Sequence, residues 1–305
     1  MQAPKTNPRA SGDHLGLAIG AILFSVFALS LGDALIKLSS NSFALWQIFV
    51  LRSVLAIPVL VGIGLAVLRG VSFWPVQPFW SLLRSLMLVA MWIVYYGALP
   101  HLQLPVAAAA FYTLPFFITL FSALLLGERI SRLGWGAVAL GFAGILLILK
   151  PDVGDFNAYA LLPLISAMLY ALSMILTRSK CQAEHPLTLA LLLNLSFIVV
   201  GAVASLVLSV APALPEDGFL MSRWSPVDAG GWLTLCIMAA GILIGSFGAA
   251  LAYQKGPPSV VGIFDFAYVG FAVIWGLVLF SDIPNASALT GIVLISVAGG
   301  LSVRR

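Results

Sequence analysis

Residues 187–210 read LTLALLLNLSFIVVGAVASLVLSV, a stretch that contains no Asp, Glu, Lys or Arg. An α-helix rises about 1.5 Å per residue, so about 20 apolar residues are needed to cross a hydrocarbon layer of about 30 Å. The stretch is long enough for that crossing, and its composition is far too apolar for the surface of a water-soluble protein. It therefore predicts a transmembrane helix.

Similar apolar runs fill nearly the whole chain. Of its 305 residues, 61% are hydrophobic and 9% are charged, whereas a soluble domain carries about 25% charged residues. The predicted membrane-spanning segments are residues 15–36, 44–68, 76–98, 104–126, 133–149, 158–178, 187–210, 231–254, 258–280 and 286–303. The sequence therefore predicts an all-α membrane protein with ten transmembrane helices.

The basic residues indicate how these helices are oriented. Ten helices place both termini on one side, and Lys and Arg are enriched in cytoplasmic connections. With cytoplasmic termini, the cytoplasmic side carries Lys5, Arg9, Arg69, Arg129, Arg132, Arg178, Lys180, Lys255, Arg304 and Arg305, and the outer side carries Lys37, Lys150 and Arg223. We therefore expect a multi-pass protein of the bacterial inner membrane with both termini in the cytoplasm.

A weak internal repeat divides the chain into two halves of five helices. Offsets of 141 and 154 residues align Ser25 with Ser166, Gly32 with Ser173, Lys37 with Arg178, Val106 with Val260, Phe121 with Trp275 and Glu128 with Asp282. Because five is odd, the second half must cross the membrane with the opposite polarity, as in the inverted repeats of secondary transporters. We expect a cytoplasmic tail at 1–14, a first repeat at 15–150 and a second at 151–305.

Several motifs resemble the EamA-type members of the drug/metabolite transporter superfamily over essentially the full chain. They are Gly32-Asp33-Ala34-Leu35-Ile36-Lys37, Leu51-Arg52-Ser53, Tyr95-Tyr96-Gly97-Ala98-Leu99 and Leu124-Leu125-Leu126-Gly127-Glu128-Arg129, the last with a degenerate second copy at Leu279-Phe280-Ser281-Asp282. The resemblance implies ten helices, a central cavity and transport of metabolites, including amino acids, nucleotide-like compounds and vitamins. The run from Gly32 to Arg52 is similar to members proposed to import S-adenosylmethionine or riboflavin.

Ionisable residues inside the predicted helices are the candidate functional residues, because each costs roughly 2.5–3.5 kcal/mol on the insertion scale. Arg52, Arg84 and Asp265 lie near the midpoints of their helices. Arginine offers a planar fork of donors that suits a carboxylate or a phosphate. Two structural roles stay open as alternatives: Arg84 and Asp265 neutralise each other, or Arg84 extends to the cytoplasmic headgroups.

Aromatic residues near these charges are candidate walls of a binding cavity. Arg84 shares a helical stripe with Tyr95, and Asp265 shares one with Tyr268 and Trp275. The other candidate substrate-binding residues are Trp92, Tyr112 and Tyr253. Small-molecule sites combine such apolar walls with a few placed polar groups, although packing in the protein core is the alternative for each aromatic residue.

Asp33 and Lys37 lie four residues apart, and therefore on one face of the first helix near its outer end. One role for them is a local ion pair that lowers the cost of insertion, and the other is an outer gate or a coupling site that takes up protons. Asp265 is the alternative proton carrier, because burial favours the protonated form of an acid. The sequence has no G-x-x-x-x-G-K-[ST] phosphate loop, so we expect movement to use a gradient of the solute or of an ion.

These observations predict an inner-membrane secondary transporter, an exporter or an importer, of a small organic metabolite such as an amino acid. It would work by alternating access around a central cavity. Uptake of S-adenosylmethionine or riboflavin is the alternative, and a polytopic lipid-modifying enzyme is a more remote one.

No enzymatic activity is expected, because the three histidines are scattered and no acyl-transfer motif is present. No cofactor, metal site or nucleic-acid partner is expected either. The expected partners are a small-molecule substrate, protons and membrane lipid, with the protein as a monomer.

Overall fold

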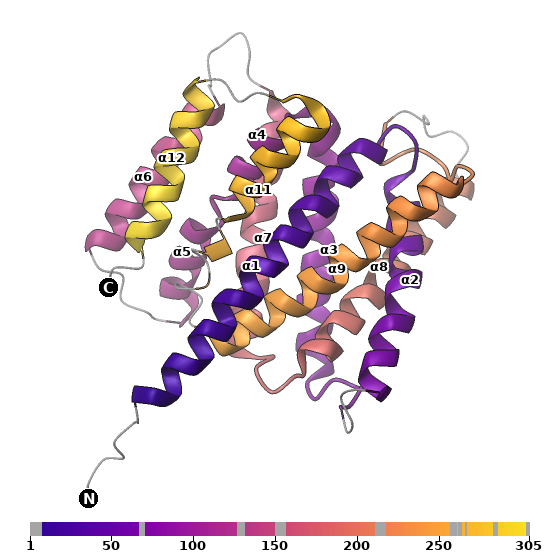
Figure 1. Ribbon diagram of the computed structural model, residues 1–305, viewed down its shortest axis with the longest axis horizontal. Coiled ribbons are helices and arrows are strands. Elements are labelled where there is room, and N and C mark those ends of the chain that lie inside the picture. The colour runs from indigo at the N-terminus through magenta and orange to yellow at the C-terminus, as the bar shows by residue number, and fades with distance from the viewer. Residues whose placement is uncertain are drawn as a thin grey trace, which may run out of the picture.

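The computed structural model describes residues 8–66, 71–126, 132–149, 157–210, 218–256, 261, 264–265, 267–282 and 286–302, and every regular element within these ranges is a helix (Figure 1). In lipid, a helix satisfies its backbone N–H and C=O groups internally, which an isolated strand cannot do. The α-helices are α1 (Pro8–Ser39), α2 (Leu45–Ala66), α3 (Pro78–Ala98), α4 (Leu104–Phe111), α5 (Leu114–Leu126), α6 (Arg132–Leu149), α7 (Leu161–Ser179), α8 (Pro186–Val210), α9 (Ala229–Lys255), α11 (Ala267–Trp275) and α12 (Ala286–Ser302). Three short elements accompany them: η1 (Leu99–His101), η2 (Ala158–Ala160) and the π-helical η3 (Gly276–Phe280).

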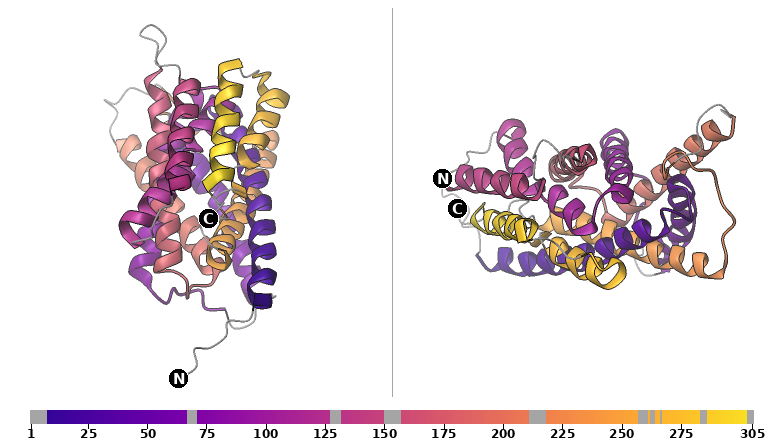
Figure 2. Two further views of the ribbon diagram at one scale, coloured as in Figure 1. Left: turned by 90° about the vertical axis from the view of Figure 1, so that its left-hand side faces the viewer. Right: turned by 90° about the horizontal axis from the view of Figure 1, so that it is seen from above.

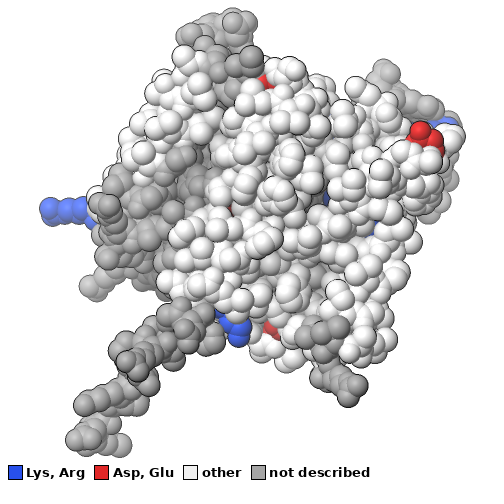
Figure 3. All heavy atoms as spheres, viewed as in Figure 1, with Lys and Arg blue, Asp and Glu red and all other residues white. Residues whose placement is uncertain are grey.

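Helix length and surface composition agree with a membrane environment. Among the described residues, seven helical stretches are long and apolar enough to cross a membrane: Leu15–Ser39, Leu45–Ala66, Pro78–His101, Leu104–Leu125, Ala158–Ser179, Pro186–Val210 and Ala229–Lys255. Large side chains such as Phe24 (73% exposed) and Leu206 (63% exposed) point outward, and on the face in Figure 3 the charged residues lie chiefly near the rim. Apolar surface of this extent marks contact with another apolar phase. The chain is therefore an all-α, multi-pass membrane protein.

Most helices coincide with the predicted apolar runs to within a few residues, with two corrections. The predicted run 258–280 contains α11 and η3, and part of its beginning lies outside the described residues. Helix α1 begins at Pro8, so helical structure extends into the region predicted as a tail. The predicted segment 104–126 is interrupted at Tyr112 and Thr113. The reason is Pro115, whose nitrogen carries no hydrogen and cannot donate to the carbonyl of Phe111 as a continuous helix requires. The count of ten transmembrane helices stays a prediction.

Helices from the two halves of the chain pack against each other in pairs. Helix α1 lies along α9, α2 along α8, α3 along α7, and α6 along α12. The pair α6–α12 forms one end of the molecule and the pair α2–α8 the other, as Figure 1 and the right-hand view of Figure 2 show. The remaining helices enclose the centre of the protein.

The contact between α1 and α9 depends on small residues. A Cβ atom added at Gly248 would lie 2.8 Å from the carbonyl oxygen of Ala21 on α1, which is too close for any side chain. One turn earlier on α9, the hydroxyl of Ser25 donates to the carbonyl oxygen of Gly245 at 2.8 Å. Small residues allow helix backbones to approach closely in lipid, where packing and interhelical hydrogen bonds hold helices together.

Candidate functional site

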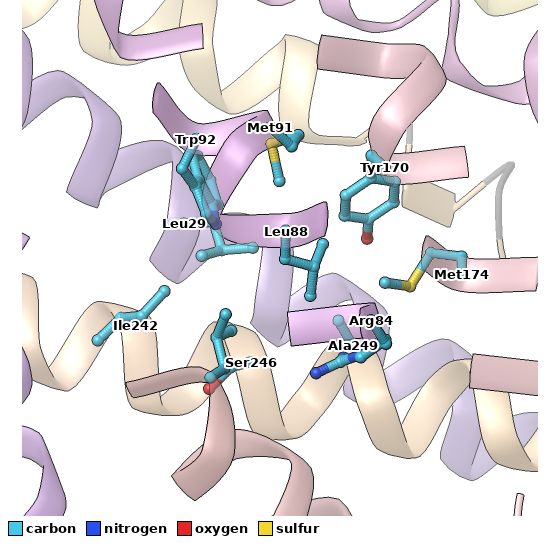
Figure 4. A pocket seen from close by; sticks show the side chains of 12 residues that line it. Leu29, Arg84, Leu88, Met91, Trp92, Tyr170, Met174, Ile242, Ser246 and Ala249 are labelled. Carbon is cyan, nitrogen blue, oxygen red and sulfur yellow. The ribbon is translucent and has the colours of Figure 1, made fainter. Parts of the chain in front are cut away.

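Helices α1, α3, α7, α8 and α9 surround a small cavity inside the protein (Figure 4). Its volume is about 20 Å³, enough for roughly one water molecule and far too small for an organic metabolite. The cavity is lined by Leu29, Arg84, Leu88, Met91, Trp92, Tyr170, Met174, Leu193, Ile242, Gly245, Ser246 and Ala249. An apolar wall with a few polar groups is typical of a small-molecule site.

Arg84 is the charged residue in the wall of this cavity, and its side chain is 1% exposed. Its Nε donates to the hydroxyl of Thr177 on α7 at 3.1 Å, whereas its Nη1 has no hydrogen-bond partner. A buried donor without a partner costs about 1–3 kcal/mol, and more when it is charged. Burial in the interior excludes the alternative in which Arg84 extends to the headgroups.

Asp265 lies among tyrosines, with its side chain 2% exposed. It accepts hydrogen bonds from the hydroxyls of Tyr112 at 3.0 Å and Tyr253 at 2.7 Å, and Tyr170 lies close enough to interact with the same carboxylate. In the part of the chain that the structure describes, no Lys, Arg or His forms an ion pair with Asp265. The alternative in which Asp265 and Arg84 neutralise each other through an ion pair is therefore wrong.

Asp33, on α1, belongs to a second tyrosine cluster. Its Oδ1 accepts from the hydroxyl of Tyr96 at 2.9 Å and its Oδ2 from the hydroxyl of Tyr268, which also lies 3.0 Å from the hydroxyl of Tyr95. Tyr268 was expected to share a face with Asp265 and contacts Asp33 instead. Its ring stacks on that of Tyr112, with centroids 5.0 Å apart, so the two carboxylate clusters are in direct contact.

Arg52, on α2, is associated with this second cluster. Its guanidinium lies over the rings of Phe49 and Phe197, 5.2 and 4.6 Å from their centroids. Its positive charge is near enough to act on Asp33 and on Tyr96. Because Arg52 is absent from the residues that line the cavity, the structure brings it to Asp33 and not to Arg84.

Lys37 pairs with a residue from the other half of the chain. Its Nζ lies 3.2 Å from the carboxylate of Asp282 and donates to the carbonyl oxygen of Leu102 at 2.8 Å. The same carboxylate accepts from the backbone N–H of Leu104 at 3.2 Å. The expected alternative, a local Lys37–Asp33 ion pair, is therefore wrong. We call the contacts among Lys37, Asp282, Leu102 and Leu104 the outer latch, after the predicted orientation.

The opposite end of the helices is also closed by polar contacts. Nη1 of Arg178, at the end of α7, donates to the carbonyl oxygen of Gln254 at 3.0 Å. The amide of Gln254 donates to the carbonyl oxygen of Glu184 at 2.7 Å, and the Glu184 carboxylate accepts from the backbone N–H of Gln77 at 2.6 Å, before the start of α3. Polar contacts therefore hold both ends of the helices around the small cavity.

The remaining predicted aromatic residues divide between the cavity and its surroundings. Trp92 lines the cavity and stacks on Tyr96, with ring centroids 4.8 Å apart. Trp275 is not among the lining residues, and its Nε1 donates to the hydroxyl of Ser30 at 3.1 Å. Tyr112, Tyr253, Tyr268 and Tyr95 form the hydroxyl networks around the two carboxylates.

Sequence reasoning did not single out the contribution of α7. Tyr170 and Met174 line the cavity and Thr177 holds Arg84. These residues are spaced at i, i+4 and i+7, so they share one face of the helix. That spacing, with two hydroxyl groups inside an apolar run, is the signal that could have identified them.

Three relatives are similar to this chain over most of its length, and one family model matches its first half. Residues 16–150 match the EamA-like transporter family. The pseudopaline exporter CntI of Pseudomonas aeruginosa is 30% identical over 279 residues, which cover 91% of this chain and 92% of that protein. A riboflavin transporter of Rhizobium johnstonii is 29% identical over 291 residues, covering 94% and 89%. An S-adenosylmethionine uptake transporter of Rickettsia bellii is 23% identical over 292 residues, covering 92% and 90%.

The fold itself is also found among solved structures. One crystal structure, with 19% sequence identity, superposes with a TM-score of 0.66 and covers 96% of each chain. The likeness therefore extends over both halves of the chain, beyond the residues that match the family.

Proposed function

This chain belongs to the EamA-like transporter family, and we propose that its central cavity is the contracted substrate site of a secondary transporter. The chain is a membrane transporter of the drug/metabolite type. The proposal adds the site, the alternating-access mechanism and the class of solute, a small organic metabolite such as an amino acid. The relatives are named for riboflavin, pseudopaline and S-adenosylmethionine, and riboflavin or S-adenosylmethionine is the alternative substrate.

The observation that carries the proposal is the state of Arg84. A fully buried guanidinium with a free Nη1, in the wall of a small cavity, costs the protein free energy when no ligand is bound. An anionic group of a solute would supply the missing partner with the bidentate geometry that arginine favours. Ionisable residues inside a membrane protein commonly mark such substrate pathways.

The pairing of helices supports two equivalent halves. Suppose that α1, α2, α3, α4–α5 and α6 are equivalent to α7, α8, α9, α11–η3 and α12. Each contact between two helices should then have a counterpart between the two equivalent helices. The counterpart of the α1–α9 contact is the α7–α3 contact. In the same way, the counterparts of the α1–α11 contact are the contacts of α7 with α4 and α5. The counterpart of the α3–α8 contact is the α9–α2 contact. Each of these counterparts is present, which favours ten helices in two inverted repeats.

An interrupted helix supports the same proposal. The predicted segment 104–126 is broken at Tyr112, where α4 ends. Inverted-repeat transporters place their substrate sites near broken helices. The hydroxyl of Tyr112 donates to the carboxylate of Asp265, a residue of the other half of the chain.

The contacts at the two ends suggest how access would alternate. Opening of the outer latch would expose the cavity on one side, and release of Arg178 from Gln254 would expose it on the other. The outer latch joins residues of the two halves, and on the other side Gln254 is linked through Glu184 to Gln77 of the first half, so each set of polar contacts can break while the other stays in place. Arg84 and Asp265 are buried inside the protein, at 1% and 2% exposure, which argues against a lipid-modifying enzyme.

The proposal is tested with purified protein in liposomes that contain no ATP. We expect counterflow of a labelled solute from a panel of amino acids, S-adenosylmethionine and riboflavin, with empty liposomes as the control. Absence of counterflow for every solute, with a product formed from the liposome lipids, would favour the enzyme instead.

The proposed topology has its own test. Reporter fusions after Arg132 and at Arg305 should report the cytoplasm, and fusions at Asp152 and Asp217 should report the periplasm. A C-terminus in the periplasm would contradict ten helices in two inverted repeats.

A further inference from the structure

We propose that Ser246 and Arg84 together form one binding site for an anionic oxygen group of the substrate, such as a carboxylate or a phosphate, with the Ser246 hydroxyl as the second donor. This inference rests on the proposed function and adds a residue to its site. It depends on which buried polar atoms lack a hydrogen-bond partner and on where those atoms lie.

A few buried side-chain atoms have no hydrogen-bond partner among the residues that the structure describes. They are Arg52 Nε and Nη2, Ser53 Oγ, Arg84 Nη1, Thr113 Oγ1, Asn194 Oδ1 and Ser246 Oγ. Of these residues, only Arg84 and Ser246 line the central cavity. The wall of the cavity therefore brings an unpartnered charged donor from α3 and an unpartnered hydroxyl from α9 to the same space.

The hydroxyl of Ser246 differs from those of other serines inside the helices. Ser85, Ser173, Ser196 and Ser205 each donate to the carbonyl oxygen four residues earlier, at 2.7–2.9 Å. Such a bond satisfies the hydroxyl within its own helix. Ser246 makes no bond of this kind, although the residue is only 6% exposed. Its hydroxyl is therefore available to a group in the cavity.

Small side chains predominate around this hydroxyl. Helix α9 contributes Ile242, Gly245, Ser246 and Ala249 to the cavity, and their spacing of i, i+3, i+4 and i+7 places them on one face. In Figure 4 the nitrogen end of Arg84 points toward the side on which Ser246 lies. The α9 side of the cavity is thus lined mainly by small groups, of which the Ser246 hydroxyl is the polar one.

The opposite wall contains side chains that can make room for a solute. The cavity must grow from its volume of about 20 Å³. Met91 and Met174 line it, and methionine adapts its shape readily because it is unbranched and has three rotatable bonds. Rotation of these two side chains would enlarge the space while the hydrogen bond from Arg84 to Thr177 stays in place.

The two donors suit one anionic group with at least two oxygen atoms. The Nε–H of Arg84 is used by Thr177, whereas Nη1 is left for a ligand. One oxygen of a carboxylate or phosphate accepts from the guanidinium, and another accepts from the Ser246 hydroxyl. Hydrogen bonds to a charged group are roughly twice as strong as neutral ones. An amide has one such oxygen and no charge, so it cannot replace the anionic group at both donors.

Stability separates a binding role of Ser246 from a structural role. Because its hydroxyl has no partner, Ser246→Ala removes a polar group whose burial is unfavourable. The Tm without substrate should therefore stay the same or rise. Ser25→Ala provides the contrast, since it removes the hydrogen bond to the carbonyl oxygen of Gly245 and should lower the Tm.

The binding experiment measures thermal shifts of the purified full-length protein with matched probes. The probes are the common L-amino acids with their primary amides, and riboflavin 5′-phosphate with riboflavin. In each pair only the first member carries an anionic group. We expect the wild type to bind the anionic member of at least one pair, and Ser246→Ala to bind it about tenfold or more weakly. The affinity for the other member should change much less.

Ser53→Ala is the matched control for this variant. The Ser53 hydroxyl is also buried and without a partner, but the residue does not line the cavity. Its removal should affect the Tm as Ser246→Ala does, because each variant deletes an unpartnered buried hydroxyl. It should leave the affinity for every probe at the wild-type value.

Several results would overturn the inference. One is wild-type affinity of Ser246→Ala for the anionic probe, and another is a fall in Tm like that of Ser25→Ala, since the hydroxyl would then have a partner within the protein. Equal weakening for both members of a pair, or no shift of the wild type with any anionic probe, would also overturn it. Failure of the proposed function gives a different result, because no solute would then show counterflow with the wild type.

Discussion

The outer latch makes a prediction whose size follows from its contacts. Asp282→Asn keeps the shape of the side chain but removes the charge that holds Lys37 at 3.2 Å. The pair is half-buried, with 14% and 16% exposure, so it is screened less than a surface ion pair. A hydrogen bond to a charged group contributes about 1.5–3 kcal/mol. Because Lys37 keeps its bond to the Leu102 carbonyl, we expect a loss of about 1–2 kcal/mol, or about 5–30-fold in the ratio of open to closed forms.

The assay measures access to the path behind the latch. Ser30 lies seven residues before Lys37 on α1, about 10 Å deeper, and is 1% exposed. Ser30→Cys introduces a thiol there, in a background with Cys236→Ser. Cys181 can stay, because it is buried and burial raises the pKa of its thiol, which slows its reaction. A polar maleimide should label the introduced thiol about 5–30-fold faster when Asp282→Asn is added, in proportion to the open form.

Two further variants make this test decisive. The double variant Lys37→Asp with Asp282→Lys restores an ion pair and should recover slow labelling in part, whereas the control Asp228→Asn should label at the original rate. Labelling of Asp282→Asn at the original rate, with the protein still folded, would refute the reasoning, since it would mean that the ion pair does not keep the outer path closed.

The other predictions concern coupling and packing. Transport into proteoliposomes should depend on pH. Asp265→Asn, or failing that Asp33→Asn, should flatten this dependence while counterflow continues. Wild-type pH profiles in both variants would exclude proton coupling through these carboxylates. Gly248→Val should lower the free energy of unfolding by about 1–3 kcal/mol, measured by thermal unfolding in detergent, because its Cβ would lie 2.8 Å from the Ala21 carbonyl oxygen. Gly20→Ala is the control, since no atom lies within 4 Å of the added Cβ. If the Tm values of the two variants are equal, the close contact of α1 with α9 is contradicted.

The elements of the fold could be predicted because their signal is local. A run such as 187–210 is apolar enough to identify a helix by itself, and helix α8 spans Pro186–Val210. The interruption at Tyr112 was also within reach, because Pro115 removes a hydrogen bond from the middle of the run. Which helices lie side by side could not be read from apolar composition, since lipid and helix surfaces offer similar apolar contacts.

The site was predicted in part for the same reason. Arg84 stands out as a charge inside an apolar run, and the structure places it in the cavity wall. Tyr170 does not stand out, because an aromatic residue is common in a membrane helix. The partner of Lys37 was missed because Asp282 lies 245 residues away in the sequence, and only the packing of α1 near η3 brings the two together.

The most direct test of the central claim is counterflow of the identified solute by Arg84→Ala in proteoliposomes, compared with wild type and with Arg132→Ala. The account predicts that Arg84→Ala inserts and folds but loses counterflow. Arg84→Lys should recover little counterflow, because a point charge cannot replace the planar fork of the guanidinium. Arg132→Ala should transport normally. Normal counterflow by Arg84→Ala would contradict the account, because the buried guanidinium would then serve the structure of the protein and not the binding of its substrate.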